Sequence, residues 1–197
     1  RRSFTSSDAQ TVQNPLLPHP AGDYVLSVTG NGDAIGSYKF RLFDLSTASA
    51  LTLGPPVGGT PNPANSTVAY KFTAAAKTKV FYDLQSAAGA DNAYLRLLDA
   101  HWNIVLATGL PNDQGPFTLN EAGTYTLLVE GYVGDQGSGN YSLNLLPASE
   151  VSQALALGNV INGSITTAGQ KQQYTFTLAT NSVLYFDSQV NDGNMLW

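Results

Sequence analysis

The stretch Ala-Gly-Thr-Tyr-Thr-Leu-Leu-Val at residues 122–129 repeats an earlier one, Ala-Gly-Asp-Tyr-Val-Leu-Ser-Val at residues 21–28. In both copies a tyrosine, a leucine and a valine occupy alternating positions, which places them on one face of a β-strand. A second block, residues 54–85, matches residues 158–189 without a gap. The chain therefore holds roughly two copies of one unit of about 100 residues, an ordinary size for a domain.

The two copies are out of phase with the ends of the chain. One unit is complete at residues 49–148, whereas the other is split, with opening strands at 149–197 and closing strands at 1–48. Half a sandwich would expose an unpaired strand edge. We therefore expect the split unit to close, either within one chain or between neighbouring chains arranged head to tail. A slice of a longer array is a third reading, and it is compatible with closure within the chain.

Short alternating segments separated by Gly, Asn, Asp and Pro clusters dominate the chain. Such spacing predicts an all-β fold, an antiparallel β-sandwich or jelly roll repeated in tandem, two units per chain with one unit split across the termini. Residues 24–29 and 37–45 are expected to form strands of the split unit. Residues 148–157 could form a helix, but by analogy with residues 46–53 we favour a linker followed by a strand.

Composition excludes several classes of function. The charged fraction of 12% is low for a helical protein, and the net charge of −5 argues against nucleic acid as a partner, because binding it needs a basic surface. The absence of cysteine excludes disulfides, zinc–thiolate sites and thiol catalysis. No segment approaches the roughly 18 apolar residues of a membrane span, and the first residues lack the apolar core of a signal peptide. We expect no membrane insertion.

Six short motifs follow one another through the complete unit. They are Leu-x-Leu-Gly-x-x-Val-x-Gly (51–59), Tyr-x-Phe-Thr (70–73), Phe-Tyr-Asp (81–83), Leu-x-Leu-Leu-Asp (95–99), Ala-Gly-x-Tyr-x-Leu-x-Val-x-Gly (122–131) and Gly-x-Tyr-x-Leu-x-Leu (139–145). Their order resembles the bacterial pre-peptidase C-terminal (PPC) domain family in its tandem-repeat form. The resemblance implies a jelly-roll β-sandwich outside the cell, without catalysis of its own. Members of the family flank secreted proteases or lie in surface arrays, and some bind calcium or a matrix polymer.

Residues for catalysis are sparse. The two histidines are His19, between two prolines, and His101, in a predicted turn. Neither lies beside a nucleophile or metalloprotease motif, and a catalytic site needs a nucleophile, a base and an orienting group together. We expect the chain not to be an enzyme.

Calcium is the ligand that the loops fit best. Asp33 and Asp135 occupy the same hairpin loop in the two units, and Asp91 and Asp192 occupy another shared loop. Turns rich in Asp, Asn and backbone carbonyls supply the oxygen ligands that Ca²⁺ prefers. The alternative is that these residues only shape the turns.

Two aromatic residues in predicted loops, Trp102 and Tyr132, are candidates for a ligand surface, because sugar rings stack on flat apolar faces. The alternative for Trp102 is that it caps one end of the sandwich. Trp197 aligns near Leu95 and is expected in a core.

The sequence predicts a non-catalytic structural or adhesive module of a large secreted or surface protein, located outside the cell or on a bacterial surface. It could form fibres by contact with neighbouring repeat units or chains. The alternative is a calcium-dependent module that binds a polysaccharide or matrix polymer and is appended to a secreted hydrolase.

Overall fold

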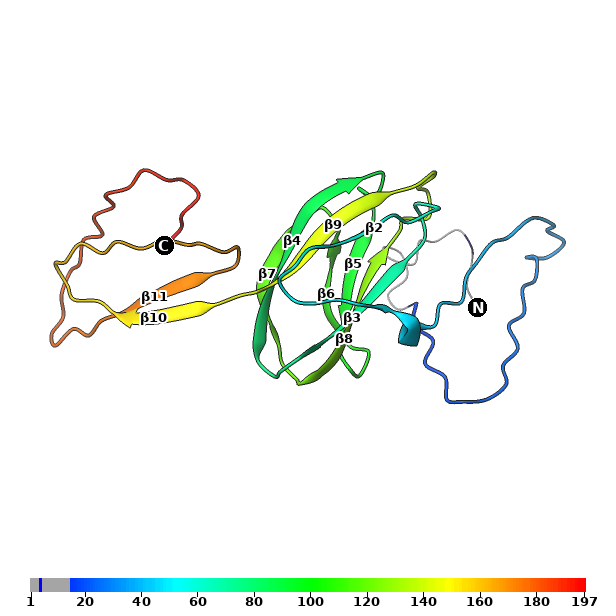
Figure 1. Ribbon diagram of the computed structural model, residues 1–197, viewed down its shortest axis with the longest axis horizontal. Coiled ribbons are helices and arrows are strands. Elements are labelled where there is room, and N and C mark those ends of the chain that lie inside the picture. The colour runs from blue at the N-terminus through cyan, green and yellow to red at the C-terminus, as the bar shows by residue number, and fades with distance from the viewer. Residues whose placement is uncertain (1–3, 5–14) are drawn as a thin grey trace.

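The computed structural model describes residue 4 and residues 15–197. Nine strands between residues 49 and 147 form two facing sheets, and two further strands lie beyond them (Figure 1). No helix in the described residues has the length and apolar character that crossing a bilayer requires. The elements are a 3₁₀ helix η1 (Leu45–Thr47) and strands β1 (Ser49–Ala50), β2 (Val57–Gly59), β3 (Val68–Ala74), β4 (Thr78–Ala88), β5 (Tyr94–Leu98), β6 (Ile104–Gly109), β7 (Gln114–Leu119), β8 (Gly123–Glu130), β9 (Asn140–Pro147), β10 (Glu150–Ala154) and β11 (Lys171–Thr175).

The two sheets have the strand orders β1-β3-β8-β5-β6 and β2-β9-β4-β7. All neighbours in them are antiparallel except β1 and β3, which pair in parallel. The predicted all-β sandwich is confirmed. The parallel edge pair was not predicted, because β1 contributes only two residues and a pattern so short has no period.

The core lies between the sheets and follows the alternation seen in the sequence. Leu95 and Leu97 from β5 and Leu127 from β8 are fully buried. The facing sheet contributes Leu143 and Leu145 from β9. The closing motif of the unit therefore encodes the inner faces of two facing strands.

Three tyrosines of the motifs fix the sandwich through their hydroxyls. The Tyr70 hydroxyl lies 2.8 Å from the Tyr141 hydroxyl, and it donates to the Gly58 carbonyl at 2.9 Å, so β3, β9 and β2 are tied together inside the core. Gly59 must be small because a Cβ there would lie 2.6 Å from the Tyr141 hydroxyl. Tyr125 donates to the Glu121 carbonyl at 2.8 Å, the arrangement of a tyrosine corner.

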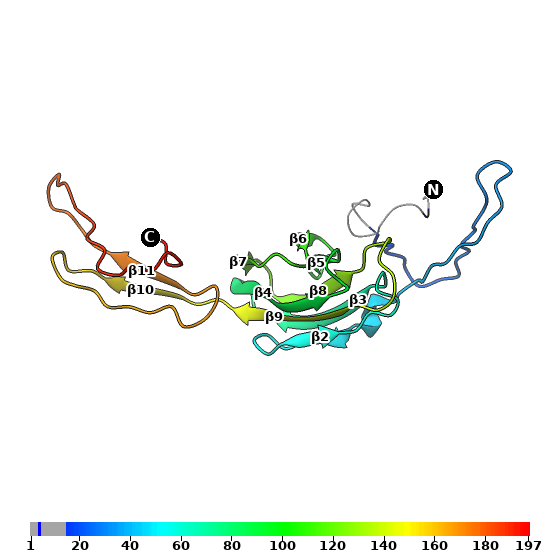
Figure 2. The same cartoon turned by 90° about the horizontal axis from the view of Figure 1, so that it is seen from above.

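Residues 15–48 (the N-terminal arm) and residues 149–197 (the C-terminal arm) extend from opposite ends of the sandwich in both views (Figures 1 and 2). Residues 24–29 and 37–44 of the N-terminal arm form no strand, so this prediction is wrong for the isolated chain. Their alternating pattern suits a strand, but a strand needs a paired neighbour to satisfy its backbone groups, and no described strand pairs with these segments. Part of the arm covers the outer face of the five-stranded sheet, where Phe43 and Leu45 pack near Leu128.

The C-terminal arm starts with the predicted linker and strand, since β10 begins at Glu150 and no helix forms. β10 pairs in parallel with β11, with Gln153 opposite Tyr174. In the complete unit β1 pairs in parallel with β3, with Ser49 opposite Tyr70. Both members of the pair are shifted by the same 104 residues, so the two parallel pairs have identical register.

Candidate functional site

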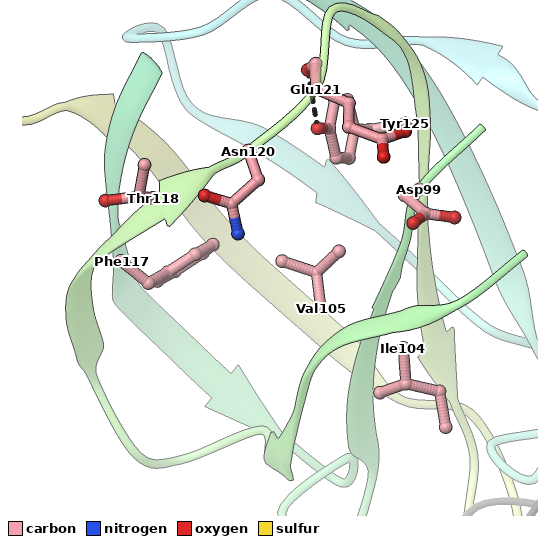
Figure 3. A pocket seen from close by; sticks show the side chains of 8 residues that line it. All are labelled: Asp99, Ile104, Val105, Phe117, Thr118, Asn120, Glu121 and Tyr125. Carbon is pink, nitrogen blue, oxygen red and sulfur yellow. Dashed lines mark hydrogen bonds between the residues drawn. The ribbon is translucent and has the colours of Figure 1, made fainter. Parts of the chain in front are cut away.

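A cavity of about 330 Å³ opens at one end of the sandwich, between β6, β7 and the turn before β8 (Figure 3). The antiparallel pairing of β5 with β8 brings the Asp99 turn and the turn before β8 to the same end of the sheet. Its lining includes both apolar and polar side chains. The cavity is lined by Asp99, Ile104, Val105, Phe117, Thr118, Asn120, Glu121 and Tyr125.

Three side chains at this end, Asp99, His101 and Glu121, have ligand atoms within 4.8 Å of one another. One imidazole and two carboxylates could in principle hold a divalent cation. However, Asp99 already accepts bonds from the His101 and Asn103 backbone amides, each at 2.8 Å, and from the Asn103 side chain at 2.9 Å. His101 Nδ1 lies 3.1 Å from Glu121 Oε2. These bonds explain why the three side chains lie together: they hold the β5–β6 turn in place, and we call the group the clasp.

The same hydrogen bonds set the ionisation of Asp99. Partial burial opposes its charge, but the bonds from Asn103 and His101 outweigh that effect and lower the pKa of this carboxyl below its ordinary value. The turn is therefore held by an ionised Asp99 through neutral pH.

The two histidines lie in different parts of the fold. His19 lies in the N-terminal arm, with its ring 4.5 Å from the ring of Tyr24, whereas His101 lies in the β5–β6 turn. Within the described residues, His101 is placed beside two carboxylates, those of Asp99 and Glu121.

Trp102 and Tyr132 lie at opposite ends of the five-stranded sheet. Trp102 follows β5 at the end where Leu98 faces Thr126, and Tyr132 follows β8 at the end where Tyr94 faces Glu130. Trp102 is 45% exposed and has a φ of +66°, a conformation uncommon for a bulky residue. Tyr132 is half-buried. The two residues thus do not form one continuous ligand surface.

The loops of Asp91 and Asp135 come together in the complete unit. The Asn92 side-chain amide donates to Asp135 Oδ1 at 2.9 Å. Asp135 Oδ2 is buried and has no hydrogen-bond partner among the described residues. Buried carboxylate oxygens are normally hydrogen-bonded, so this oxygen is an exception among the described residues.

The corresponding loops of the split unit are apart. Asp33 is exposed in a turn of the N-terminal arm, where Ala34 donates to the Asn31 carbonyl at 3.3 Å. Asp192 is exposed in the C-terminal arm, and its Oδ1 accepts from the Asn194 backbone at 3.0 Å. Asp33 thus lies in a local turn and Asp192 hydrogen-bonds within one, and among the described residues no hydrogen bond joins the two loops as Asn92 joins Asp135.

Trp197 is 91% exposed and stacks on Phe186 with ring centroids 4.1 Å apart, so its expected place in a core is wrong for the isolated arm. A core position needs a second sheet, and the C-terminal arm has none over it.

A buried ion pair was missed by sequence reasoning. Arg96 Nε lies 3.1 Å from Glu130 Oε2, and both side chains are 2% exposed. The only signal was a charged residue inside each of two apolar strands, at positions 96 and 130. Such a pair costs desolvation free energy, and losing one partner would leave a buried charge without its counter-charge.

No family model matches the chain, and the search of curated proteins also gave no match. The chain is similar to the pre-peptidase C-terminal domain of a collagenase from Bacillus anthracis, with 20% identity over 50% of this chain and 93% of that chain and a TM-score of 0.42. It is also similar to PliG, a periplasmic lysozyme inhibitor of g-type lysozyme. The Aeromonas hydrophila protein has 13% identity over 50% of this chain and 96% of that chain, with a TM-score of 0.36. The Salmonella Typhimurium protein has 14% identity over 50% and 97%, with the same TM-score of 0.36.

These likenesses are too distant to carry an argument about function. One of the proteins bears the name of the family that the sequence motifs resemble, and the other two are inhibitors. The β-sandwich itself rests on the sheets described above, and a fold alone does not specify an activity.

Proposed function

We propose that the chain is a non-catalytic structural and adhesive repeat module of a larger secreted or surface protein. The observation that carries this proposal is the repetition of one strand pair in identical register, β1–β3 in the complete unit and β10–β11 in the C-terminal arm. A repeated module stabilises and extends a chain through its contacts with its neighbours. The function is then to hold units in line and to present loops to a partner.

The junction between the units supports a structural role. Only Ala148 and Ser149 separate β9 from β10. Glu150 forms ion pairs with Lys79 of β4 and, at 3.6 Å, with Lys171 of β11. Gly169 lies so close to the sandwich that a Cβ there would be 2.6 Å from Phe81 Cβ. The second unit therefore begins directly against the first.

Co-sedimentation with insoluble polymers tests the proposal. The full chain is mixed with insoluble polysaccharide or collagen fibres, in calcium or in EDTA, and the protein in the pellet is measured. We expect the chain to be retained in the pellet to the same extent in calcium and in EDTA, and no soluble sugar or peptide to be released. A chain that stays in the supernatant would contradict the adhesive role. Release of soluble product would contradict the non-catalytic role.

A calcium-dependent binding module is the second candidate, and the buried oxygen of Asp135 favours it. This oxygen has no hydrogen-bond partner among the described residues, although the other oxygen of the same carboxylate is bound by Asn92. Ca²⁺ binds carboxylate and carbonyl oxygens, which this loop pair contains.

Thermal unfolding in calcium and in EDTA tests this candidate, since a ligand that binds only the folded state raises Tm. If calcium binds, Tm rises by several degrees, and Asp135→Asn abolishes the shift. The matched control is Asp33→Asn, the same change in the equivalent loop of the N-terminal arm. Equal Tm values in calcium and EDTA would remove calcium from the function.

A further inference from the structure

Strand β6 is an open edge of the complete sandwich. One side of it pairs with β5, and no described strand pairs with the other side. Edge strands of natural proteins are usually short, or carry a charge or a proline, because an open edge pairs readily with other chains. The other edges of the two sheets follow this rule: β1 and β2 have two and three residues, and β7 contains Pro116. β6 has six residues, Ile-Val-Leu-Ala-Thr-Gly, with neither a charge nor a proline.

The pairing of β6 with β5 shows which backbone groups face the open side. Leu110 donates its backbone N–H to the Ala93 carbonyl at 2.8 Å, so these two residues are a hydrogen-bonded pair. Along an antiparallel ladder such pairs alternate with pairs that are not hydrogen-bonded. Three places along the register, the pair of Arg96 and Ala107 is of the second kind. The N–H and C=O of Ala107 therefore point away from β5, and Ala107 is exposed.

The cavity at the end of the sandwich lies beside this edge (Figure 3). Ile104 and Val105 of β6 line it together with Phe117 of β7, the edge strand of the facing sheet. A strand added to β6 would point alternate side chains towards the facing sheet, and one of them would reach this cavity. Val105 and Phe117 pack against the hydrophobic core, so an apolar side chain would find apolar neighbours there.

The charge beside the cavity indicates what kind of segment fits the edge. The charged side chains that line the cavity, Asp99 and Glu121, are both acidic. A lysine or arginine next to the apolar side chain would complement them, and complementary charges favour association and select the partner. The edge of a second copy could not supply this cation, because β6 itself has no charged residue. The fitting segment is therefore extended, with an apolar residue flanked by basic ones.

Exposed apolar side chains extend this surface at the start of the edge. Ile104, the first residue of β6, is 47% exposed, and Trp102, two residues before it, is 45% exposed. The φ of +66° at Trp102 is a costly conformation for a bulky residue, and such conformations concentrate at binding and active sites. Tryptophan is also enriched among the residues that carry most of the binding free energy at protein interfaces.

We propose that β6 is a docking edge, to which a partner protein adds an extended segment as a further strand of the five-stranded sheet. An apolar side chain of the segment enters the cavity, and a neighbouring lysine or arginine faces Asp99 and Glu121. Main-chain hydrogen bonds to Ala107 contribute affinity, while the cavity and the two carboxylates select the segment. This interaction goes beyond the proposed structural role, and the retention of the chain on insoluble polymers does not depend on it.

Binding of a synthetic peptide to the full chain is the first test. The probe is fluorescently labelled Lys-Val-Lys-Phe-Lys-Val-Lys, and the matched control peptide has glutamate in place of every lysine. In fluorescence anisotropy we expect a Kd below about 0.5 mM for the lysine peptide and binding at least about tenfold weaker for the glutamate peptide. Absence of binding by the lysine peptide, or equal binding of both peptides, would overturn the proposal.

Three variants of the chain test the backbone pairing and the charge separately. Ala107→Pro removes the N–H that faces the open side and should weaken binding about tenfold, whereas Ala107→Val keeps this N–H and should bind within about twofold of the parent. A proline is tolerated on an edge strand, and far-UV circular dichroism checks that the fold is kept. Glu121→Gln removes one carboxylate charge and should weaken binding roughly two- to fivefold. Unchanged binding by Ala107→Pro or by Glu121→Gln would contradict the proposal.

Amide hydrogen exchange of the unaltered full chain gives a readout that needs no variant to fold. The Ala107 amide should exchange about tenfold more slowly when the lysine peptide is saturating, whereas the Thr108 amide, which faces β5, should change little. Peptide binding without slower exchange at Ala107 would refute strand addition. In sedimentation velocity without peptide, a dimer that Ala107→Pro abolishes would also overturn the proposal, because the edge would then belong to a second copy of the chain.

Discussion

Removing either hydroxyl of the buried Tyr70–Tyr141 pair should destabilise the sandwich, but by unequal amounts. Each phenol has one hydrogen to donate. Tyr70 donates its hydrogen to the Gly58 carbonyl, so the hydrogen between the two rings belongs to Tyr141. The order of donation is therefore Tyr141 to Tyr70 to Gly58. Burial, the largest cause, raises the pKa of both tyrosines, which keeps both hydroxyls protonated.

Tyr70→Phe leaves the Tyr141 donor without an acceptor in the core, and Tyr141 is only 1% exposed. An unsatisfied buried donor costs about 1–3 kcal/mol, so we expect a loss of about 2 kcal/mol in the free energy of unfolding. Tyr141→Phe leaves Tyr70 bonded to Gly58 and should cost about 0.5–1 kcal/mol. In the double variant no donor is orphaned, and the loss should fall short of the sum by about 1 kcal/mol.

Urea unfolding followed by far-UV circular dichroism measures these differences. For a sandwich of this size, a loss of about 2 kcal/mol corresponds to a Tm roughly 8–16 °C lower, which a thermal scan would check independently. The urea dependence of the free energy should be the same in all variants, because the surface exposed on unfolding hardly changes. Equal losses from the two single variants, or additive losses in the double variant, would refute the order of donation.

Three further changes test other parts of the sandwich. Gly131→Ala should cost about 1–3 kcal/mol in urea unfolding, because its Cβ would lie 2.5 Å from the carbonyl carbon of Asn65 and 2.6 Å from its Cα, whereas Gly36→Ala, in open space, should be neutral. Glu130→Gln should cost about 3–5 kcal/mol by the same assay, since it leaves a buried guanidinium without its carboxylate; a loss below about 1 kcal/mol would disprove this. Burial and then a neighbouring carboxylate raise the pKa of Asp83, so its ionised form weakens the folded state and stability falls as pH rises past that pKa. Asp83→Asn should therefore raise Tm at pH 7 and have little effect near pH 3, and a constant difference across this range would be the contrary result.

The fold of the complete unit could be predicted because its information is local. Alternation of Tyr125, Leu127 and Val129 gives a strand face, and the Gly and Asn clusters give its ends. The repeat also favoured the strand that begins at Glu150 over a helix. Strand order and the parallel β1–β3 pair could not be read in this way, because they depend on contacts between residues far apart in the sequence.

The arms show where a correct pattern is not sufficient. Residues 24–29 have the same alternation as β8, yet they form no strand, and no strand in the described part of the chain pairs with them. Trp197 aligns with a core position but is exposed for the same reason. The repeat predicts which neighbouring strands these segments would pack against. The structure of a single chain shows the segments without those neighbours.

The candidate sites show the same difference between features that are local in the sequence and contacts between distant residues. The sequence could identify the loops of Asp91 and Asp135 separately, but the bond from Asn92 to Asp135 joins residues 43 positions apart. The clasp of Asp99, His101 and Glu121 was missed, because β5–β8 pairing alone brings the last of these residues to the turn.

The two-residue link between β9 and β10 bears on how far such a protein can reach. Ala148 and Ser149 span at most about 7 Å, and the ion pairs of Glu150 fix the direction in which the chain leaves the sandwich. A flexible tether lengthens only with the square root of its number of residues. With links this short, successive modules would instead form a stiff rod, whose length grows in direct proportion to the number of modules and which carries tension along an almost unbroken strand.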